Sequence, residues 1–185
     1  MNTLKFCFCA LGLFVFFCCG CSIFPSKNKE VRLDEANSKA KVVDGARLKS
    51  GGGLVVIPFR AGSGIGQTEE LERVSLMFVK GFVEVISERN GPLRTISPQE
   101  ASRADFILKG HVTKLKQTKG MKKWLSKAKD FEMMMEGEMV DQKTGQTVFV
   151  FSDKRKVTQE NQDFKALAYT IGQDLARLVL DSINE

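Results

Sequence analysis

Few side chains in this sequence could carry out chemistry. The 185 residues include one His, one Tyr and one Trp, and all five Cys fall within the first 21 positions. This composition excludes a metal site built from several His or Cys ligands and a Ser-His-Asp triad in its usual form. Glu132, Glu136 and Glu138 share a predicted strand and could act as acids or bases, but no nucleophile–base pair accompanies them. We interpret them as the solvent face of a sheet and expect a protein that is not an enzyme, with no metal and no cofactor.

Two further features have both a chemical and a structural interpretation. Gly62-Ser63-Gly64-Ile65-Gly66 lies between a predicted strand and a predicted helix, which is the context of phosphate-binding loops. Gln67 stands where the dinucleotide pattern needs Gly, and no Lys-Ser/Thr pair follows. We interpret the segment as a connecting loop, with an anion site or partner contact as the alternative. His111 has no second His or free thiol to join it, which favours a surface or half-buried strand histidine over a metal ligand.

The first 21 residues have the pattern of an export signal. An uncharged, largely apolar run follows Lys5 and ends near Cys19, and it is shorter than the roughly 20 apolar residues that span a membrane. The run ends in Cys18-Cys19-Gly20-Cys21, which resembles the bacterial lipoprotein box. This resemblance implies a signal peptide over residues 1–20 and a lipid, palmitate included, on Cys21. The alternative is a signal peptide that merely contains several Cys.

The lipid would tether the mature protein to a membrane without spanning it. Ser22, rather than Asp, after the modified residue favours export to the outer membrane. We therefore expect an outer-membrane lipoprotein whose folded domain faces the periplasm.

The positive charge of the chain is concentrated in one segment. Residues 114–129 contain seven Lys and no acid, whereas the formal net charge of the whole chain is +6. Met121, Trp124, Leu125 and Ala128 recur at helical spacing there, which predicts a short basic amphipathic helix. We take it as a solvated excursion, or as a contact with a membrane, a neighbouring subunit or an anionic polymer. The candidate contact residues are Lys119, Lys122, Lys123, Trp124, Lys127 and Lys129. No motif favours nucleic acid as a partner.

The remaining sequence predicts a tether and one domain. Residues 21–53 are mostly polar, which predicts a tether with a short strand near residues 41–43. Residues 54–185 are predicted to form the domain, with a Lys-rich insert at 116–130. Apolar periodicity predicts strands over 54–59, 93–96, 106–115, 131–140 and 147–157, and helices over 68–87 and 161–183. Met133, Met134, Met135 and Met139 are expected in the core, with an adaptable partner surface as the alternative. This order predicts an α/β (α+β) domain, with a mixed sheet covered on one face by two main helices.

Three segments carry a family resemblance. Residues 55–59 (Val-Val-Ile-Pro-Phe), 104–112 (Ala-Asp-Phe-Ile-Leu-Lys-Gly-His-Val) and 138–145 (Glu-Met-Val-Asp-Gln-Lys-Thr-Gly) occur in that order. The pattern resembles bacterial periplasmic lipoproteins related to the curli-secretion lipoprotein, the amino-terminal domain of the Tol–Pal propeller protein and the penicillin-binding-protein activator lipoprotein. The resemblance implies a single anticodon-binding-like sandwich and offers no catalytic residues.

These observations favour a non-enzymatic, protein-binding subunit or accessory factor of a cell-envelope assembly for secretion, appendages or wall synthesis. The expected partners are the membrane, through the lipid anchor, and other envelope proteins, a second copy of the chain among them. The alternative is a monomeric module that binds cell wall or a cell-wall synthase through residues 114–129. A subunit that forms its own membrane pore would need amphipathic hairpins, which the sequence does not offer.

Overall fold

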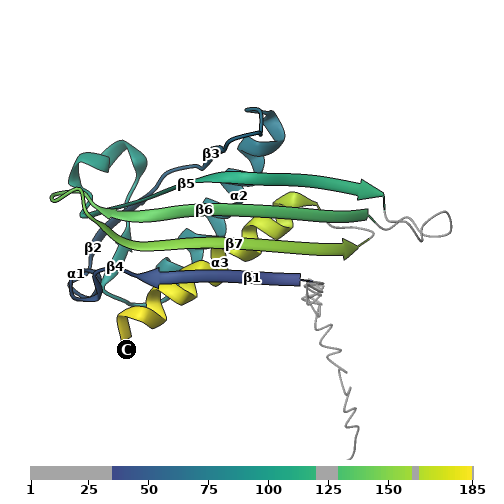
Figure 1. Ribbon diagram of the computed structural model, residues 1–185. Coiled ribbons are helices and arrows are strands. Elements are labelled where there is room, and N and C mark those ends of the chain that lie inside the picture. The colour runs from purple at the N-terminus through teal and green to yellow at the C-terminus, as the bar shows by residue number, and fades with distance from the viewer. Residues whose placement is uncertain (1–34, 120–128, 160–162, 185) are drawn as a thin grey trace, which may run out of the picture. The chain divides into compact units, whose positions relative to one another are not determined.

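A mixed sheet with two long helices on one face forms the domain, as the sequence predicts (Figure 1). The computed structural model describes residues 35–119, 129–159 and 163–184. The strands follow the order β1-β7-β6-β5-β2-β4, and β3 pairs with β5. The pairs among β1, β7, β6 and β5 are antiparallel, whereas β2 and β3 run parallel to β5, and β4 runs parallel to β2. The strands are β1 Glu35–Val42, β2 Gly52–Val56, β3 Arg60–Ala61, β4 Leu93–Thr95, β5 Phe106–Lys119, β6 Lys129–Asp141 and β7 Thr147–Gln159.

Polar side chains cap the first turns of α2 (Glu69–Glu88) and of the 3₁₀ helix η1 (Pro98–Arg103). Thr68 precedes α2, and its side-chain oxygen accepts a hydrogen bond of 3.2 Å from the backbone N–H of Leu71. Ser97 caps η1, in which Pro98 takes the first turn. The second long helix is α3 (Phe164–Asn184), and a short helix, α1, covers Gly45–Lys49. Local sequence therefore sets the start of α2 and of η1, whereas α3 begins three residues after its predicted start at residue 161.

Small residues allow α2 and α3 to pack closely. A Cβ atom on Gly81 would lie 2.2 Å from the backbone oxygen of Tyr169, and one on Gly172 would lie 2.3 Å from that of Phe78. Such distances are far below van der Waals contact, so only glycine fits at either position without moving a backbone.

The face of the sheet under the helices is filled by Met and Phe side chains. Met133, Met135 and Met139 have no exposed surface, which confirms that these three methionines belong to the core. The prediction is wrong for Met134, which is half-buried on the opposite face, because successive side chains of a strand point to opposite sides of the sheet. Gly110 of β5 and Gly137 of β6 lie opposite each other. A Cβ atom on Gly110 would lie 2.7 Å from the ring of Phe59, and one on Gly137 would lie 2.7 Å from the ring of Phe151. The two glycines thus leave room for aromatic rings to lie on the sheet, where the Phe59 and Phe151 centroids are 5.9 Å apart.

The folded part of the chain begins earlier than the sequence indicates. We expected a tether through residue 53, but within that range β1 forms an edge strand beside β7 and α1 follows it. Side chains 36–41 of β1 are all exposed and are Ala, Asn, Ser or Lys. The strand is therefore held mainly by its main-chain pairing to β7, and it lacks the alternating apolar pattern by which strands are recognised.

A charged network lies on the covered face of β7. The Arg155 guanidinium donates two hydrogen bonds of 2.9 Å to Asp153 and one of 2.7 Å to Asp174 in α3. Ser38 of β1 donates its hydroxyl hydrogen to Asp153. Arg155 and Asp153 are 3% and 5% exposed, so the ion pair between them is buried. Through it, the exposed Ser38 of β1 and the partly exposed Asp174 of α3 are joined to β7. Burial lowers the pKa of Arg155, and its bonds to Asp153 and Asp174 outweigh that effect, so the pKa lies above its ordinary value.

The single tyrosine provides a spectroscopic test of the packing between α2 and α3. The Tyr169 hydroxyl donates a hydrogen bond of 2.6 Å to Glu84, and this bond, together with burial, raises the pKa of Tyr169 to about 12. The folded state thus retains this proton more firmly than the unfolded chain. The resulting stabilisation is complete below the model-compound value of 10.0 and is lost as the pH rises towards 12. Ultraviolet titration of the phenolate should give a midpoint near 12.

Replacing Glu84 by Gln is the matched control for this titration. It removes the charge that opposes ionisation of Tyr169, so the midpoint should fall towards 10.0. The titration reports on Tyr169 alone, because the sequence has no other tyrosine. A midpoint near 10.0 in the unaltered protein would therefore contradict the hydrogen bond between Tyr169 and Glu84.

Candidate functional site

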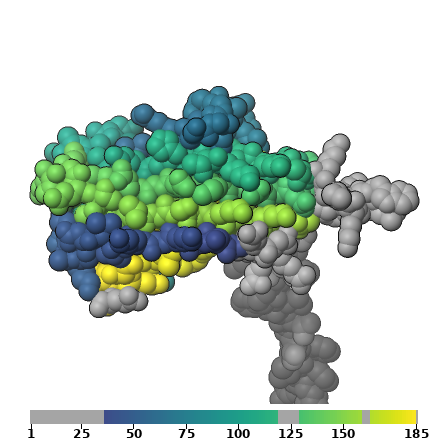
Figure 2. All heavy atoms as spheres, viewed as in Figure 1, coloured from purple at the N-terminus to yellow at the C-terminus, as the bar shows by residue number. Residues whose placement is uncertain are grey.

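The face of the sheet opposite the two helices is uncovered along β1, β7, β6 and β5 (Figure 2), whereas η1 packs on it at β2. We call it the open face; it consists of the outward side chains of β1, β7, β6 and β5 together with Arg60 of β3. Its basic residues are Lys39, Lys41, Arg60, Lys109, Lys114, Lys116, Lys154 and Lys156, and its acidic residues are Asp130, Glu132, Glu136 and Glu138. The open face therefore carries a net positive charge.

Strand register aligns one row of side chains across this face. Arg60 pairs with His111, His111 with Glu136, Glu136 with Ser152, and Ser152 with Lys39. Neighbours in such a row stand close enough for their side chains to interact. The row starts and ends with a cation, neither of which has a carboxylate partner among the described residues.

The glutamates of β6 are mostly neutralised by lysines of the adjacent strands. Lys114 lies 2.8 Å and Lys154 3.7 Å from Glu132, and Lys109 lies 3.3 Å from Glu138. The hydrogen bond from Lys114 lowers the pKa of Glu132; those from the Thr147 hydroxyl and Lys109 lower that of Glu138. A general acid at neutral pH needs a raised pKa, so neither carboxyl group is suited to that role. Their position confirms the interpretation as a solvent-facing row.

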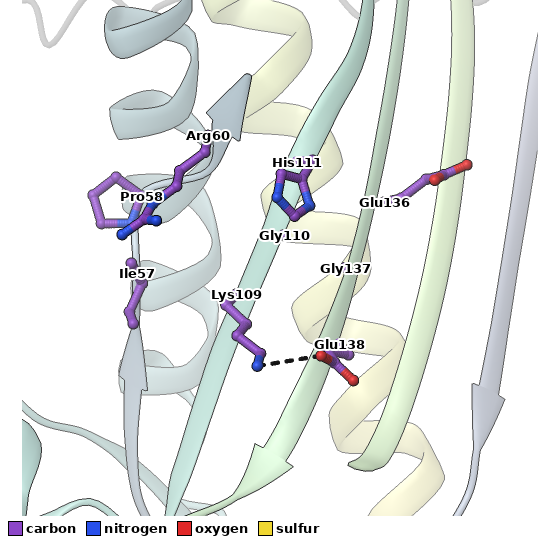
Figure 3. Close-up of a pocket in the computed structure, with 9 residues that line it drawn as sticks. All are labelled: Ile57, Pro58, Arg60, Lys109, Gly110, His111, Glu136, Gly137 and Glu138. Atoms are coloured by element: carbon purple, nitrogen blue, oxygen red, sulfur yellow. Dashed lines mark ion pairs between the residues drawn. The ribbon is translucent and has the colours of Figure 1, made fainter. Parts of the chain in front are cut away.

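A shallow hollow of about 490 Å³ lies at one side of the open face (Figure 3). One wall comes from Ile57, Pro58 and Arg60, and the remainder from three consecutive residues in each of β5 (109–111) and β6 (136–138). The Lys109 side chain extends along the sheet towards Glu138, whereas Glu136 points away from the hollow (Figure 3). His111 is exposed at the surface of β5. The hollow thus presents Arg60 and His111 beside a floor of sheet backbone at Gly110 and Gly137.

Most of the residues that the sequence nominated lie outside the described structure. Cys21, Lys122, Lys123, Trp124 and Lys127 are among them, and so is the predicted helix over residues 121–128. The backbones of Lys119 and Lys129 pair as the last residue of β5 and the first of β6. Residues 116–119 and 129–130, expected in the insert, therefore belong to these two strands, because main-chain pairing continues beyond the alternating apolar pattern.

A second polar cluster forms where the motif segments meet. Arg47 of α1 bonds to Asp141, lies 3.8 Å from Asp105 and stacks over the Phe106 ring at 4.3 Å. Asp141 also accepts hydrogen bonds of 2.8 Å from the backbone N–H groups of Lys143 and Thr144. The N–H of Thr144, followed by Arg47, lowers the pKa of Asp141 to about 2. Every member of the cluster is bound within the chain, which indicates that it holds the β6–β7 turn against α1.

The Gly-rich segment connects β3 to α2, as expected for a loop. The backbone N–H of Gly62 donates to Val112, and that of Ile65 donates to Gly62. The helix that follows begins with three glutamates, Glu69, Glu70 and Glu72. These carboxylates would repel a phosphate at the helix N-terminus, which disfavours the anion-site alternative.

The described residues contain neither a membrane-spanning helix nor a cluster of metal ligands. None of the described helices is both long and apolar enough to cross a membrane. Within residues 35–119, 129–159 and 163–184, no group of three His, Cys, Asp or Glu side chains could hold a metal ion.

The fold defines the class of protein: an α+β sandwich with one mixed sheet and one helical layer. No protein-family model and no curated protein matches the chain. Among solved structures, the PelC dodecamer of Paraburkholderia phytofirmans is similar, with 10% identity and a TM-score of 0.56 over 79% of this chain and 98% of PelC.

Protein XCC0632 of Xanthomonas campestris, of family DUF330, is also similar, with 11% identity and a TM-score of 0.52 over 72% of this chain and 86% of that one. At such low identity these likenesses show a shared fold. They support the sandwich that the sequence predicts, while the kinship with the curli, Tol–Pal and synthase-activator proteins stays a prediction.

Proposed function

We propose that this chain is a lipoprotein of the bacterial outer membrane that binds other envelope proteins without catalysing a reaction. The lipid anchor would be at Cys21 and the domain would face the periplasm, where it would act as a subunit or accessory factor of an assembly. The lipoprotein-box pattern at residues 18–21 supports the anchor. The fold shared with PelC, a protein solved as a dodecamer, is compatible with a role as a subunit.

The main observation behind this proposal is the open face of the sheet. A sheet packed on one side can remain solvated on the other, but here four long neighbouring strands present a continuous charged surface with a hollow at its side. The lowered pKa values of Glu132 and Glu138 favour binding over acid–base chemistry at this surface. Charged surfaces of this kind steer and orient protein partners.

The test is to isolate the full lipidated chain from bacterial membranes. Cells are crosslinked, the membranes are extracted in mild detergent, and the chain is sized and its co-purifying proteins are identified. We expect a species much larger than the 20.6 kDa calculated from the sequence. Labelling with a clickable palmitate analogue, compared between the parent and Cys21→Ser, checks the anchor separately.

A monomer that crosslinks to no protein would contradict the proposed function. That outcome would favour the second candidate, a monomeric module that binds cell wall or a synthase through residues 114–129. One structural feature supports this candidate: Lys116 and Lys129 are exposed near the same end of β5 and β6.

A further inference from the structure

The charges of the domain are divided between its two layers. The open face is net positive, and the cations at the ends of its central row, Arg60 and Lys39, lack acidic partners among the described residues. The helical layer has the opposite character at α2, which carries five glutamates against Arg73 and Lys80. Because the helices lie on one side of the sheet (Figure 1), the acidic surface of α2 and the basic open face belong to different sides of the domain.

The acidic surface is available to a partner. Glu70 and Glu72 in the first turn of α2 are exposed and make no ion pair with any described residue, whereas Glu69 is bound to Arg73. Leu76 lies one turn further along α2 and is 57% exposed, and Leu178 of α3 is 41% exposed. The helical layer therefore combines unpaired carboxylates with exposed apolar side chains, the composition of a surface that binds a partly polar, basic partner.

We infer that the occupant of the open face is a second copy of this chain, which packs the outer surface of its α2 against that face. Arg60 and Lys39 would then meet Glu70 and Glu72 of the neighbouring copy. The inference rests on the proposed function, because it identifies the partner of the same open face. Charge complementarity selects this occupant: an acidic surface is required, and the chain carries one on its other side.

Contact between two different surfaces has a consequence for symmetry. A sheet-to-helix contact is heterologous, so every copy keeps one free surface until a ring closes. Copies anchored in one membrane can be related by rotation about the membrane normal, which keeps each anchor at the same height. A closed ring therefore suits a tethered chain better than an open filament does.

The experiment uses charge reversal in the full lipidated chain, purified in mild detergent and sized by analytical ultracentrifugation at low salt. One variant changes the open face (Lys39→Glu with Arg60→Glu), and another changes α2 (Glu70→Lys with Glu72→Lys). A third carries all four substitutions. The control, Lys49→Glu with Arg94→Glu, makes the same charge change at exposed residues of α1 and β4, which lie off the open face.

The parent and the control should form an assembly of this chain alone, which added salt weakens. Each two-residue variant should associate at least about ten-fold more weakly, because each contact then places like charges together. The four-residue variant should recover the parent assembly, since it restores opposite signs with the surfaces exchanged. Recovery also shows that the altered chains still fold.

Other outcomes overturn the inference in distinguishable ways. If all variants assemble like the parent, the copies meet elsewhere and only this contact is wrong. If the parent contains one copy among other proteins, the proposed function stands and the self-contact is wrong. A monomer that binds no protein but binds vesicles containing anionic phosphatidylglycerol through Arg60 and Lys39 would contradict both and assign the open face to a membrane.

Discussion

Replacing Arg155 by leucine is expected to lower the free energy of unfolding by about 3 to 5 kcal/mol. The guanidinium is 3% exposed and binds Asp153 with two hydrogen bonds and Asp174 with one. Leucine would leave the buried Asp153 carboxylate with only the Ser38 hydroxyl as a side-chain partner. An uncompensated buried charge costs far more than the loss of an exposed ion pair, so the effect should be among the largest of any single substitution.

Two further variants locate the cause of that loss. Arg177 lies 2.9 Å from the same Asp174 but is largely exposed, so Arg177→Leu should cost less than about 1 kcal/mol. Combining Asp153→Asn with Arg155→Leu should be less harmful than Arg155→Leu alone, because a neutral amide is cheaper to bury than a carboxylate. Denaturant unfolding measures all of these values. Equal losses in Arg155→Leu and Arg177→Leu would show that the network is not buried in solution.

This network also shows what sequence patterns could not reveal. Asp153 and Arg155 occupy alternate positions of a predicted strand, which would normally place them on the solvent side of an amphipathic sheet. They lie instead on the covered face, because each satisfies the other and Asp174 from α3 completes the set. Asp174 is 19 residues from Arg155 in the chain, so no local pattern reports the contact.

The elements that were predicted correctly depend on local signals. Apolar residues at helical spacing over 68–87 predicted α2, and alternation of Met with Glu marks the two faces of β6. Only the end of β1 was predicted, as a short strand near residues 41–43. The rest was missed because its side chains carry no apolar alternation and its position depends on pairing with β7, more than 100 residues later. Strand pairing over such a distance is a property of the whole fold.

The candidate site, too, was predicted where local signals exist and missed where it depends on contacts between distant segments. The sequence singled out His111 and the glutamates of β6 separately, but it could not show that Arg60, His111 and Glu136 form one row, because their strands meet only in the folded sheet. Likewise, Asp105 and Asp141 were noted in two motifs, and the structure brings both to Arg47. The predicted contact residues between Lys122 and Lys127 lie outside the described structure, so their role stays a prediction.

Gly172→Ala is expected to destabilise the domain by about 3 kcal/mol, although alanine favours helix by about 1 kcal/mol over glycine. The added Cβ would lie 2.3 Å from the backbone oxygen of Phe78 and 2.9 Å from the backbone nitrogen of Phe82. Neither atom can rotate away, so α3 must move from α2. That movement loosens the packing of Phe78 and Phe82, both of which have no exposed surface.

The matched control is Gly66→Ala, because no atom lies within 4 Å of the position that its Cβ would take. Its stability should stay within about 0.5 kcal/mol of the parent. Gly81→Ala, whose Cβ would meet the backbone oxygen of Tyr169 at 2.2 Å, should resemble Gly172→Ala. The double variant should lose less than the sum of the two losses, since one separation of the helices makes room for both methyl groups. Thermal and denaturant unfolding measure these values, and full additivity would mean that the two glycines do not share one helix–helix contact.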